Sequence, residues 1–218
     1  FLLWLLCGPP AFAQVPKRGY AEPHGFRAQD WRFEPDSQRN PRRLRALTAI
    51  SAGAYTGSMV YLGTAWYAGQ DLGRFRFFND WREWQQMDKV GHMWSAYHCS
   101  RGFIDLHKWA GVDKRSALWR GGLYGWLAVS RIEVFDGFGE RWGFSWPDIG
   151  ANALGSGLAV LNEGLWHEDR LWLKMSYLPS PYAGDTAFTD LFGTHWSQWP
   201  AKDYNGQVHW LSVRVHSF

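Results

Sequence analysis

The chain of 218 residues has little cysteine, little excess charge and no nucleotide-binding motif. It contains 2 cysteines, and we expect Cys7 to be removed with a signal peptide, which leaves Cys99 alone and excludes an intrachain disulfide. The formal net charge of +3 and the lack of a basic stripe with interleaved aromatics predict no nucleic-acid partner. The glycines at 137–143 lack P-loop spacing, so we expect no phosphate cradle there.

Tryptophan, by contrast, is abundant, with 16 residues in the chain. Its ring is apolar and carries one N–H donor, and it collects at membrane–water boundaries. A Trp-rich soluble core is the alternative interpretation. With apolar stretches nearby, the composition favours a membrane-associated protein, and we expect the membrane to be a partner.

The beginning of the chain, FLLWLLCGPPAFAQ, is an apolar stretch that ends in a small-x-small pattern. This pattern is typical of a signal-peptidase site. We expect residues 1–13 to be a signal peptide, truncated at its start because a charged n-region is missing, with an uncleaved anchor as the alternative. Leu6 stands where a lipidation signal needs a small residue, which argues against lipidation of Cys7. Either reading predicts export to the periplasmic side of the bacterial cell envelope.

Residues 14–45 are polar and rich in Pro and Arg, which predicts an extended arm. Residues 46–69 then carry no charge in 24 positions, a length that can cross a bilayer as a helix. Gly53 and Gly57 form a small-xxx-small face that suits contact with another helix. The run is weakly hydrophobic, so a buried bundle helix is the alternative.

Three more helices are predicted, at about 83–109, at 114–135 and from an N-cap at Ser145 to about 166. Small residues recur on the second and third of them, which indicates close helix contacts. The predicted fold is therefore mainly α, a compact bundle of about four helices with small-residue interfaces, followed by a short β-rich or irregular C-terminal tail.

The tail alternates at RLWLKMSY, breaks at prolines and alternates again after Asn205-Gly206, a hairpin turn signal. We expect a hairpin there, truncated at the end of the chain. The predicted organisation is a signal peptide at 1–13, a polar arm at 14–45, a helical domain at 46–166 and an irregular or hairpin tail at 167–218.

Each of the last three predicted helices carries an acid-containing pair at helical spacing in an otherwise apolar or small-residue context. Residues three or four apart share one helix face. A lone acid on an apolar face is costly unless it is paired, neutralised or wet, so we expect all pairs to face one bundle axis. The pairs are Asp88 and His92, Glu133 and Asp136, and Asp148 and Asn152.

Two interpretations of these pairs remain open. In the first, the polar cluster is architectural, since a satisfied network fixes helix register, and the protein has a structural or binding role. In the second, the cluster is a site, because carboxylates with one histidine suit a divalent metal. The candidate metal ligands are Asp88, His92, Glu133, Asp136 and Asp148, with Lys89, Ser95, Ser145 and Asn152 as supporting residues.

A histidine beside a carboxylate also suits general acid–base work. His92, Asp88 and Glu133 are therefore the candidate catalytic residues of a metal-dependent hydrolase-type enzyme that acts on an envelope lipid or a cell-wall precursor. A third idea, an ion or solute pathway, requires the run 46–69 to span the membrane. His98 and His107 are out of step with His92, and we expect both on the surface.

The motifs DKVGH, EVFDG and GFSWPDIGANALG resemble a family of uncharacterised bacterial envelope proteins, the YfiM-like predicted periplasmic lipoproteins, over about residues 84–160. A fainter likeness links the Asp-Lys-x-x-His start and the Asp-x-x-x-Asn-x-x-Gly helix to VanZ-like membrane proteins. The resemblance brings no known reaction, but it implies that the polar pairs form one recurring constellation. Its marked positions are Asp88, Lys89, His92, Ser95, Glu133, Asp136, Gly137, Ser145, Asp148, Asn152 and Gly155.

Overall fold

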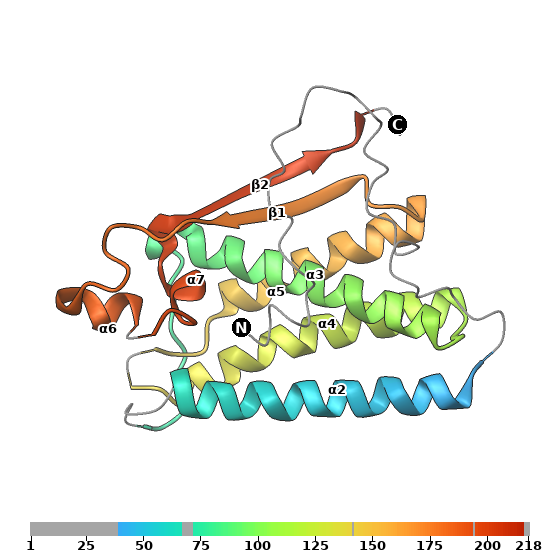
Figure 1. The fold of residues 1–218 in the computed structure, drawn as a ribbon, viewed down its shortest axis with the longest axis horizontal. Helices are drawn as coiled ribbons and strands as arrows, with labels where there is room; N and C mark the ends of the chain where they lie inside the picture. Colours follow the sequence, from blue (N-terminus) through green and yellow to red (C-terminus); the bar gives the residue numbers. More distant parts are fainter. Residues whose placement is uncertain (1–38, 67–71, 141, 194, 216–218) are drawn as a thin grey trace.

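The computed structural model describes residues 39–66, 72–140, 142–193 and 195–215, without the side chains of Ala65, Trp66 and Asp190. The expected signal peptide and most of the polar arm lie outside these residues. The described residues form a mainly helical fold with a C-terminal two-stranded sheet, as predicted (Figure 1). The long helices are α2 (Pro41–Tyr61), α3 (Met87–Trp109), α4 (Lys114–Asp136) and α5 (Trp146–Leu161).

The helix ends are set by local chemistry, as the sequence predicts. Gly111 follows α3 with a φ of 70°, a left-handed conformation that glycine adopts without a steric penalty. The Asp113 side chain caps α4 by accepting a hydrogen bond from the Ser116 N–H. Ser145 caps α5 by accepting from the Asp148 N–H, and Pro147 occupies the first turn.

Helices α3, α4 and α5 form the core of the bundle, and glycines let their backbones approach. A Cβ atom on Gly125 of α4 would lie 2.3 Å from the Ser100 backbone nitrogen of α3. A Cβ atom on Gly155 of α5 would lie 2.0 Å from the Met93 carbonyl oxygen. Both distances are impossible contacts, so any larger residue would force the helices apart. The predicted small-residue interfaces are confirmed at these positions.

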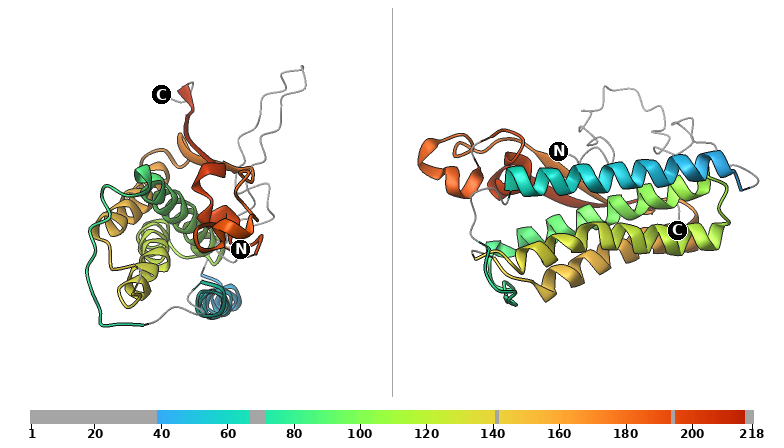
Figure 2. Two further views of the ribbon diagram at one scale, coloured as in Figure 1. Left: turned by 90° about the vertical axis from the view of Figure 1, so that its left-hand side faces the viewer. Right: turned by 90° about the horizontal axis from the view of Figure 1, so that it is seen from below.

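Helix α2 lies to one side of this three-helix core (Figure 2, left view). Asn40 caps it by accepting hydrogen bonds from the Arg42 and Arg43 N–H groups, so it begins within the segment expected to be extended. Leu47 and Ser58 are its buried residues, and a Cβ on Gly53 would meet nothing within 4 Å. Helix α2 is thus peripheral, and no described helix makes the close contact expected at Gly53.

No helix in the described part of the chain combines the length and the apolar character that crossing a membrane requires.

The tail forms one antiparallel sheet that lies beside α3 (Figure 1). Strand β1 (Leu171–Tyr177) pairs with β2 (Gln207–Val213), so that Leu171 faces Val213 and Tyr177 faces Gln207. The predicted Asn205-Gly206 hairpin is wrong: these residues lie in a 3-10 turn before β2, whose partner is the earlier strand. The connection contains η5 (Thr186–Phe188), α6 (Thr189–Phe192), α7 (Trp199–Lys202) and η6 (Tyr204–Gly206).

The shorter elements extend and connect the long helices. A wide π-helical turn ends each of two helices, η2 (Leu62–Trp66) after α2 and η4 (Asn162–Trp166) after α5. The segment before α3 is an aromatic loop (residues 72–83) followed by the short turn η3 (Trp84–Gln86). This loop is held by backbone bridges from Leu72 to Gly139 and from Phe77 to Phe144, which place it across one end of the bundle.

Candidate functional site

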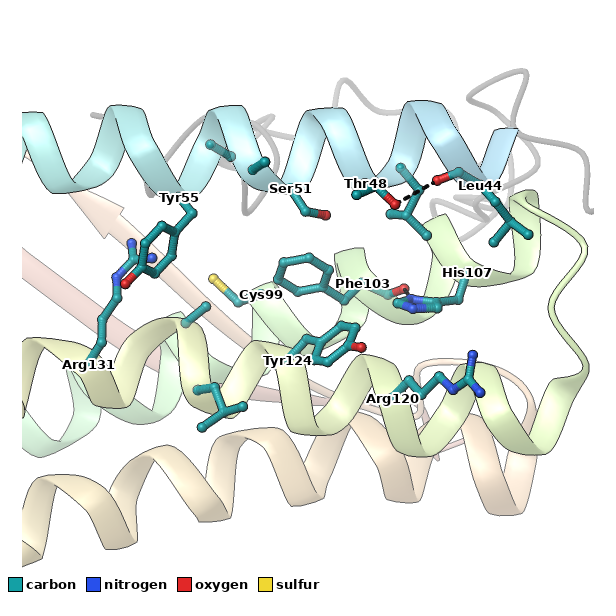
Figure 3. A pocket seen from close by; sticks show the side chains of 15 residues that line it. Leu44, Thr48, Ser51, Tyr55, Cys99, Phe103, His107, Arg120, Tyr124 and Arg131 are labelled. Carbon is teal, nitrogen blue, oxygen red and sulfur yellow. Dashed lines mark hydrogen bonds between the residues drawn. The ribbon is translucent and has the colours of Figure 1, made fainter. Parts of the chain in front are cut away.

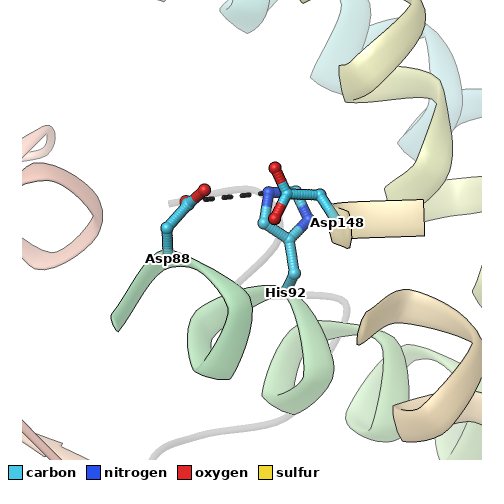
Figure 4. A group of neighbouring side chains, drawn as sticks. All are labelled: Asp88, His92 and Asp148. Carbon is cyan, nitrogen blue, oxygen red and sulfur yellow. Dashed lines mark ion pairs between the residues drawn. The ribbon is translucent and has the colours of Figure 1, made fainter. Parts of the chain in front are cut away.

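The predicted polar pairs meet at one end of the bundle, where α3 begins, α4 ends and α5 begins. Asp88 and His92 lie on the first turns of α3, and Asp148 lies on the first turn of α5 opposite them (Figure 4). We call this group the site cluster; it comprises Asp80, Asp88, Lys89, His92, Glu133, Ser145, Asp148 and Asn152. The antiparallel order of the helices thus brings three distant sequence motifs to one place.

Three residues of the site cluster could hold a metal ion. One ligand atom from each of Asp88, His92 and Asp148 lies within 4.8 Å of the other two. The distance from His92 Nε2 is 3.8 Å to Asp88 Oδ1 and 3.3 Å to Glu133 Oε1. The Asp88 side chain is 22% exposed, whereas those of Asp148 and Glu133 are 4% and 2% exposed. Asp88 is therefore the acid of this group that is most accessible to solvent.

The imidazole of His92 is oriented by a chain of hydrogen bonds on its other edge. The Asn152 amide donates to the Ser130 hydroxyl at 3.3 Å, which turns its oxygen toward His92. That oxygen lies 3.1 Å from His92 Nδ1 and can accept only if this nitrogen carries the proton. In the neutral ring Nε2 is then the unprotonated nitrogen. This is how proteins commonly prepare a histidine to bind a metal.

Lys89 is the one lysine in the site cluster, and it lies among three carboxyl groups. Its ammonium nitrogen bonds to Asp80 and lies 3.4 Å from Asp88 and 3.0 Å from Asp148. Burial opposes the charge, but Asp80 and Asp148 raise the pKa of Lys89 above its ordinary value. Lys89 is therefore a fixed positive charge that partly neutralises the acids.

Ser145 ties the start of α5 to the other elements. Its N–H donates to Glu133 at 3.1 Å, and its hydroxyl donates to Asp80 at 2.7 Å. The same hydroxyl caps α5 by accepting from the Asp148 N–H at 3.2 Å. One residue thus positions two acids and the helix that carries a third.

The site cluster holds more negative charge than its cations neutralise. It contains four carboxyl groups and one ammonium group: Asp80, Asp88 and Asp148 lie beside Lys89, and Glu133 lies beside His92. Burial raises the pKa of Glu133 to about 8 and that of Asp148 to about 7. Burial opposes the protonation of His92, but Asp88, Glu133 and Asp148 raise its pKa above the ordinary value. Without a further cation, protons compensate the excess charge.

Not every predicted residue is a candidate ligand in the structure. Asp136 lies half-buried on the last turn of α4, outside the group of three, although its charge helps raise the pKa of Glu133. Ser95 lies half-buried on α3, three residues after His92. Glu133 lies beside His92, and Lys89, Ser145 and Asn152 contact Asp148, Glu133 and His92 respectively; their supporting role stays a prediction.

Three polar residues of this region were not predicted from the sequence. Asp80, from the aromatic loop, bonds to Lys89 and Ser145. Ser130 on α4 orients Asn152, and the Tyr204 hydroxyl donates to Asp88 at 2.8 Å from the C-terminal tail. Asp80 and Tyr204 lie in irregular segments without periodicity, so no pattern could reveal them. Ser130 lies three residues before Glu133 and was open to detection by helical spacing.

The backbone immediately before the DKVGH motif is strained. Trp84, Gln85 and Gln86 have φ values of 49°, 49° and 67°. These are left-handed backbone conformations, which residues other than glycine seldom adopt. Three such residues in succession persist only where the surrounding contacts enforce them, and this strain concentrates at functional sites. Here the strained segment directly precedes the helix turn that carries Asp88 and Lys89.

A second charged group lies farther along α3, and we call it the distal cluster; it comprises Arg101, Asp105, Lys108, Glu163 and Asp169. Its members are at most a quarter exposed. Nearby His107 is buried and His98 bonds to the Leu173 carbonyl, so the surface position expected for both histidines is wrong. Their contacts lie on neighbouring turns and on β1, which periodicity alone does not reveal.

A comparison with known protein families finds a match in the part of the chain that carries the site cluster. Residues 77–164 match a family described as "Predicted periplasmic lipoprotein (DUF2279)". The chain matches no curated protein and no solved structure. The matched segment runs from the aromatic loop to the end of α5 and contains all three polar pairs. The helical bundle with its buried charged cluster is thus similar to a family of predicted periplasmic lipoproteins, which supports the expected location in the cell envelope.

Proposed function

We propose that this envelope protein binds a divalent metal ion through Asp88, His92 and Asp148. The observation that carries the proposal is the geometry of these three residues: their ligand atoms converge within 4.8 Å, and Asn152 leaves His92 Nε2 free to coordinate. Glu133 lies beside His92 and is suited to bind the ion or a water on it. One imidazole with carboxylates favours Zn²⁺ or Mn²⁺ over Ca²⁺, which prefers oxygen ligands alone.

The charge of the site cluster supports the same proposal. Burying carboxyl groups without compensation is costly, and the raised pKa values of Glu133 and Asp148 report that cost. A bound dication would replace the protons and compensate the charge. A purely architectural network explains the hydrogen bonds of Ser145 and Asn152 equally well. It does not explain why the site cluster contains more buried carboxyl groups than basic side chains.

Metal content measured with a matched control separates the two explanations. Wild type, His92→Ala and His195→Ala are each dialysed against micromolar Zn²⁺ or Mn²⁺, gel-filtered and analysed by elemental mass spectrometry. His195 is an exposed histidine that bonds to Ser197, so its replacement controls for the loss of an imidazole. We expect one equivalent of metal in wild type and in His195→Ala, and less than about a tenth in His92→Ala, since even the loss of a residue that only hydrogen-bonds to a metal ligand costs about 10–100-fold in affinity.

Thermal unfolding provides the second readout. A ligand that binds only the folded state raises the melting temperature, so added metal should stabilise wild type and His195→Ala but not His92→Ala. Equal and negligible metal in all three proteins, with His92→Ala merely less stable, would leave the network architectural.

One observation favours a second candidate, a metal-dependent hydrolase-type enzyme. Glu133 has a pKa raised to about 8 and lies 3.3 Å from His92, so the pair holds a transferable proton near neutral pH. The substrate of such an enzyme would be an envelope lipid or a cell-wall precursor that reaches the cluster at Asp88, the most exposed of the three proposed metal ligands. The test is turnover of a lipid-linked cell-wall precursor by metal-loaded protein; Glu133→Gln should keep the metal and lose the turnover.

The exposed aromatics support association with the membrane surface. Phe77 and Trp81 of the aromatic loop are 64% and 60% exposed, and Arg74, Arg76 and Arg82 lie between and beside them. Aromatic rings and arginines together suit the interface of an anionic bilayer. Sedimentation with phosphatidylglycerol vesicles tests this role, and binding that is unchanged in the double variant Phe77→Ser, Trp81→Ser would exclude the loop.

The likeness to YfiM-like and VanZ-like proteins stays a prediction from the motifs.

A further inference from the structure

A cavity of about 550 Å³ separates α2 from α3 and α4. Figure 3 shows it as an elongated space between the α2 ribbon and the other two helices. Cavities of about 300–1,000 Å³ are the usual size for small-molecule sites. Its wall is mostly apolar, and small residues of α2, among them Ser51, Ala52 and Ala54, leave the space that Phe103 and Leu127 line from the other side.

The charged residues of the cavity are arginines, and they lie toward its two ends. Arg131 and Tyr55 lie at one end, and Arg120 lies near His107 at the other (Figure 3). Among the residues that the structure describes, no aspartate or glutamate lines the cavity. The cavity therefore combines an apolar middle with positive charge.

Arg131 is the informative residue, because it is half-buried without an anionic partner. Its guanidinium donates to the Ser58 hydroxyl and lies 4.8 Å from the centre of the Tyr55 ring. The buried Nε atom has no hydrogen-bond partner, and no carboxylate among the described residues forms an ion pair with Arg131. Arg101, by contrast, bonds to Glu163 and pairs with Asp169. A sheltered guanidinium for which the described residues supply no counter-charge is costly, so the geometry favours an anionic occupant beside Arg131.

The cavity is separate from the site cluster. Arg131 and Glu133 are two residues apart on α4, a spacing that directs side chains to opposite sides of a helix. Glu133 faces α3 and α5, whereas Arg131 faces α2. An occupant of the cavity therefore would not contact the proposed metal ligands, and the inference does not rest on the metal.

We infer that the cavity binds a single-chain amphiphile, with its acyl chain along α2 and its anionic head at Arg131. The apolar wall accounts for the chain, and the unpaired guanidinium accounts for the head, since arginine forms strong bidentate bonds with carboxylate and phosphate. A free fatty acid and a lysophospholipid share this chemistry. A cell-envelope location would supply both.

Isothermal titration calorimetry tests the inference with two probes below their micellar concentrations, palmitate and lysophosphatidylglycerol. The proteins are wild type, Arg131→Gln, Ala128→Phe and a control, Lys174→Gln, whose lysine lies over the Trp172 ring on β1. We expect saturable binding of one molecule of at least one probe to wild type and to the control. Arg131→Gln should weaken it at least about tenfold, as loss of a hydrogen bond to a charged group does. Ala128→Phe should abolish it by filling the cavity.

The comparison of probes identifies the source of the anion. Tighter binding of palmitate would assign a free fatty acid, and tighter binding of lysophosphatidylglycerol would assign a lipid head group. Failure of both probes to bind wild type, equal affinity in Arg131→Gln and wild type, or complete displacement of the probe by millimolar acetate would overturn the inference. Unchanged far-UV circular dichroism of both variants shows that a loss of binding is not a loss of folding.

Discussion

Helix α3 carries two buried charged groups, one near each end, and they differ in how their charges are balanced. In the distal cluster Arg101 bonds to Glu163 at 2.7 Å and pairs with Asp169 at 3.2 Å, and Lys108 bonds to Glu163 at 2.8 Å. Two basic side chains there thus form ion pairs with three acids. In the site cluster the one lysine pairs with three of the four carboxyl groups, and Glu133 lies beside His92 instead.

The difference in charge balance affects two buried glutamates, Glu163 and Glu133, whose pKa values shift in opposite directions. Burial opposes ionisation of Glu163, but Lys108 and Arg101 lower its pKa below the ordinary value. Burial raises the pKa of Glu133 to about 8, and His92 only partly offsets this. Asp105 is the exception in the distal cluster, because burial raises its pKa despite Arg101. Both glutamates are buried, so the difference in their pKa values comes mainly from the basic side chains nearby. The acids of the distal cluster are paired in a structural ion-pair network, whereas the site cluster has too few basic side chains and is suited to bind a cation.

The largest effect is expected from breaking the distal cluster at Arg101. Arg101→Ala leaves Glu163 and Asp169 buried with less compensation, and removing one partner of a buried network costs about 3–5 kcal/mol. Chemical denaturation at pH 7 measures the loss. The control is Arg170→Ala, which removes a more exposed pair with Glu168 and should cost about 0–1 kcal/mol. Similar small losses in both variants would show that the distal cluster does not stabilise the fold.

The pH dependence of stability should distinguish the clusters next. In chelator-treated protein Glu133 has a folded pKa of about 8, above its unfolded value of about 4.5. The folded state then binds more protons, so this group lowers the free energy of unfolding as the pH rises from about 4.5 through 8. Glu133→Gln should flatten that decline, measured by denaturation between about pH 4 and pH 9, a range that spans both values.

Glu163→Gln is the matched variant, with the opposite sign. The folded pKa of Glu163 is lowered, so its contribution is present above the unfolded pKa and is lost as the pH falls through the folded pKa. Its replacement should lower stability at neutral pH and leave the decline above pH 5 in place. Parallel pH curves for the two variants would contradict the proposed difference in charge balance.

The smallest effect is expected at Tyr204, which joins the C-terminal tail to the site cluster. Tyr204→Phe removes the hydrogen bond to Asp88 and should cost about 0.5–1.5 kcal/mol, with one-to-one metal binding retained. Tyr182→Phe, at an exposed position, is the control. Loss of metal from Tyr204→Phe would make the tail part of the metal site itself and would extend the site cluster beyond the helices.

Much of the helical architecture was predictable because its signals are local. The Ser145 cap, the Gly111 stop and the glycine contacts of α4 and α5 each depend on spacing within one helix. The partner of β2 was not predictable, because the Asn205-Gly206 signal competes with a longer connection that tertiary contacts select. The position of α2 also depends on packing, since its uncharged run suits a membrane, a core or a peripheral helix equally well.

The sequence by itself determined which side chains share a helix face, and so it placed Asp88 with His92 and Asp148 with Asn152. Only the tertiary structure decided that these faces meet, that Asp80 and Tyr204 join them, and that the cluster holds four acids but only one lysine. The physical reason is range. Helical spacing is a property of neighbouring residues, whereas the charge balance of a buried group depends on distances and burial among residues far apart in the chain.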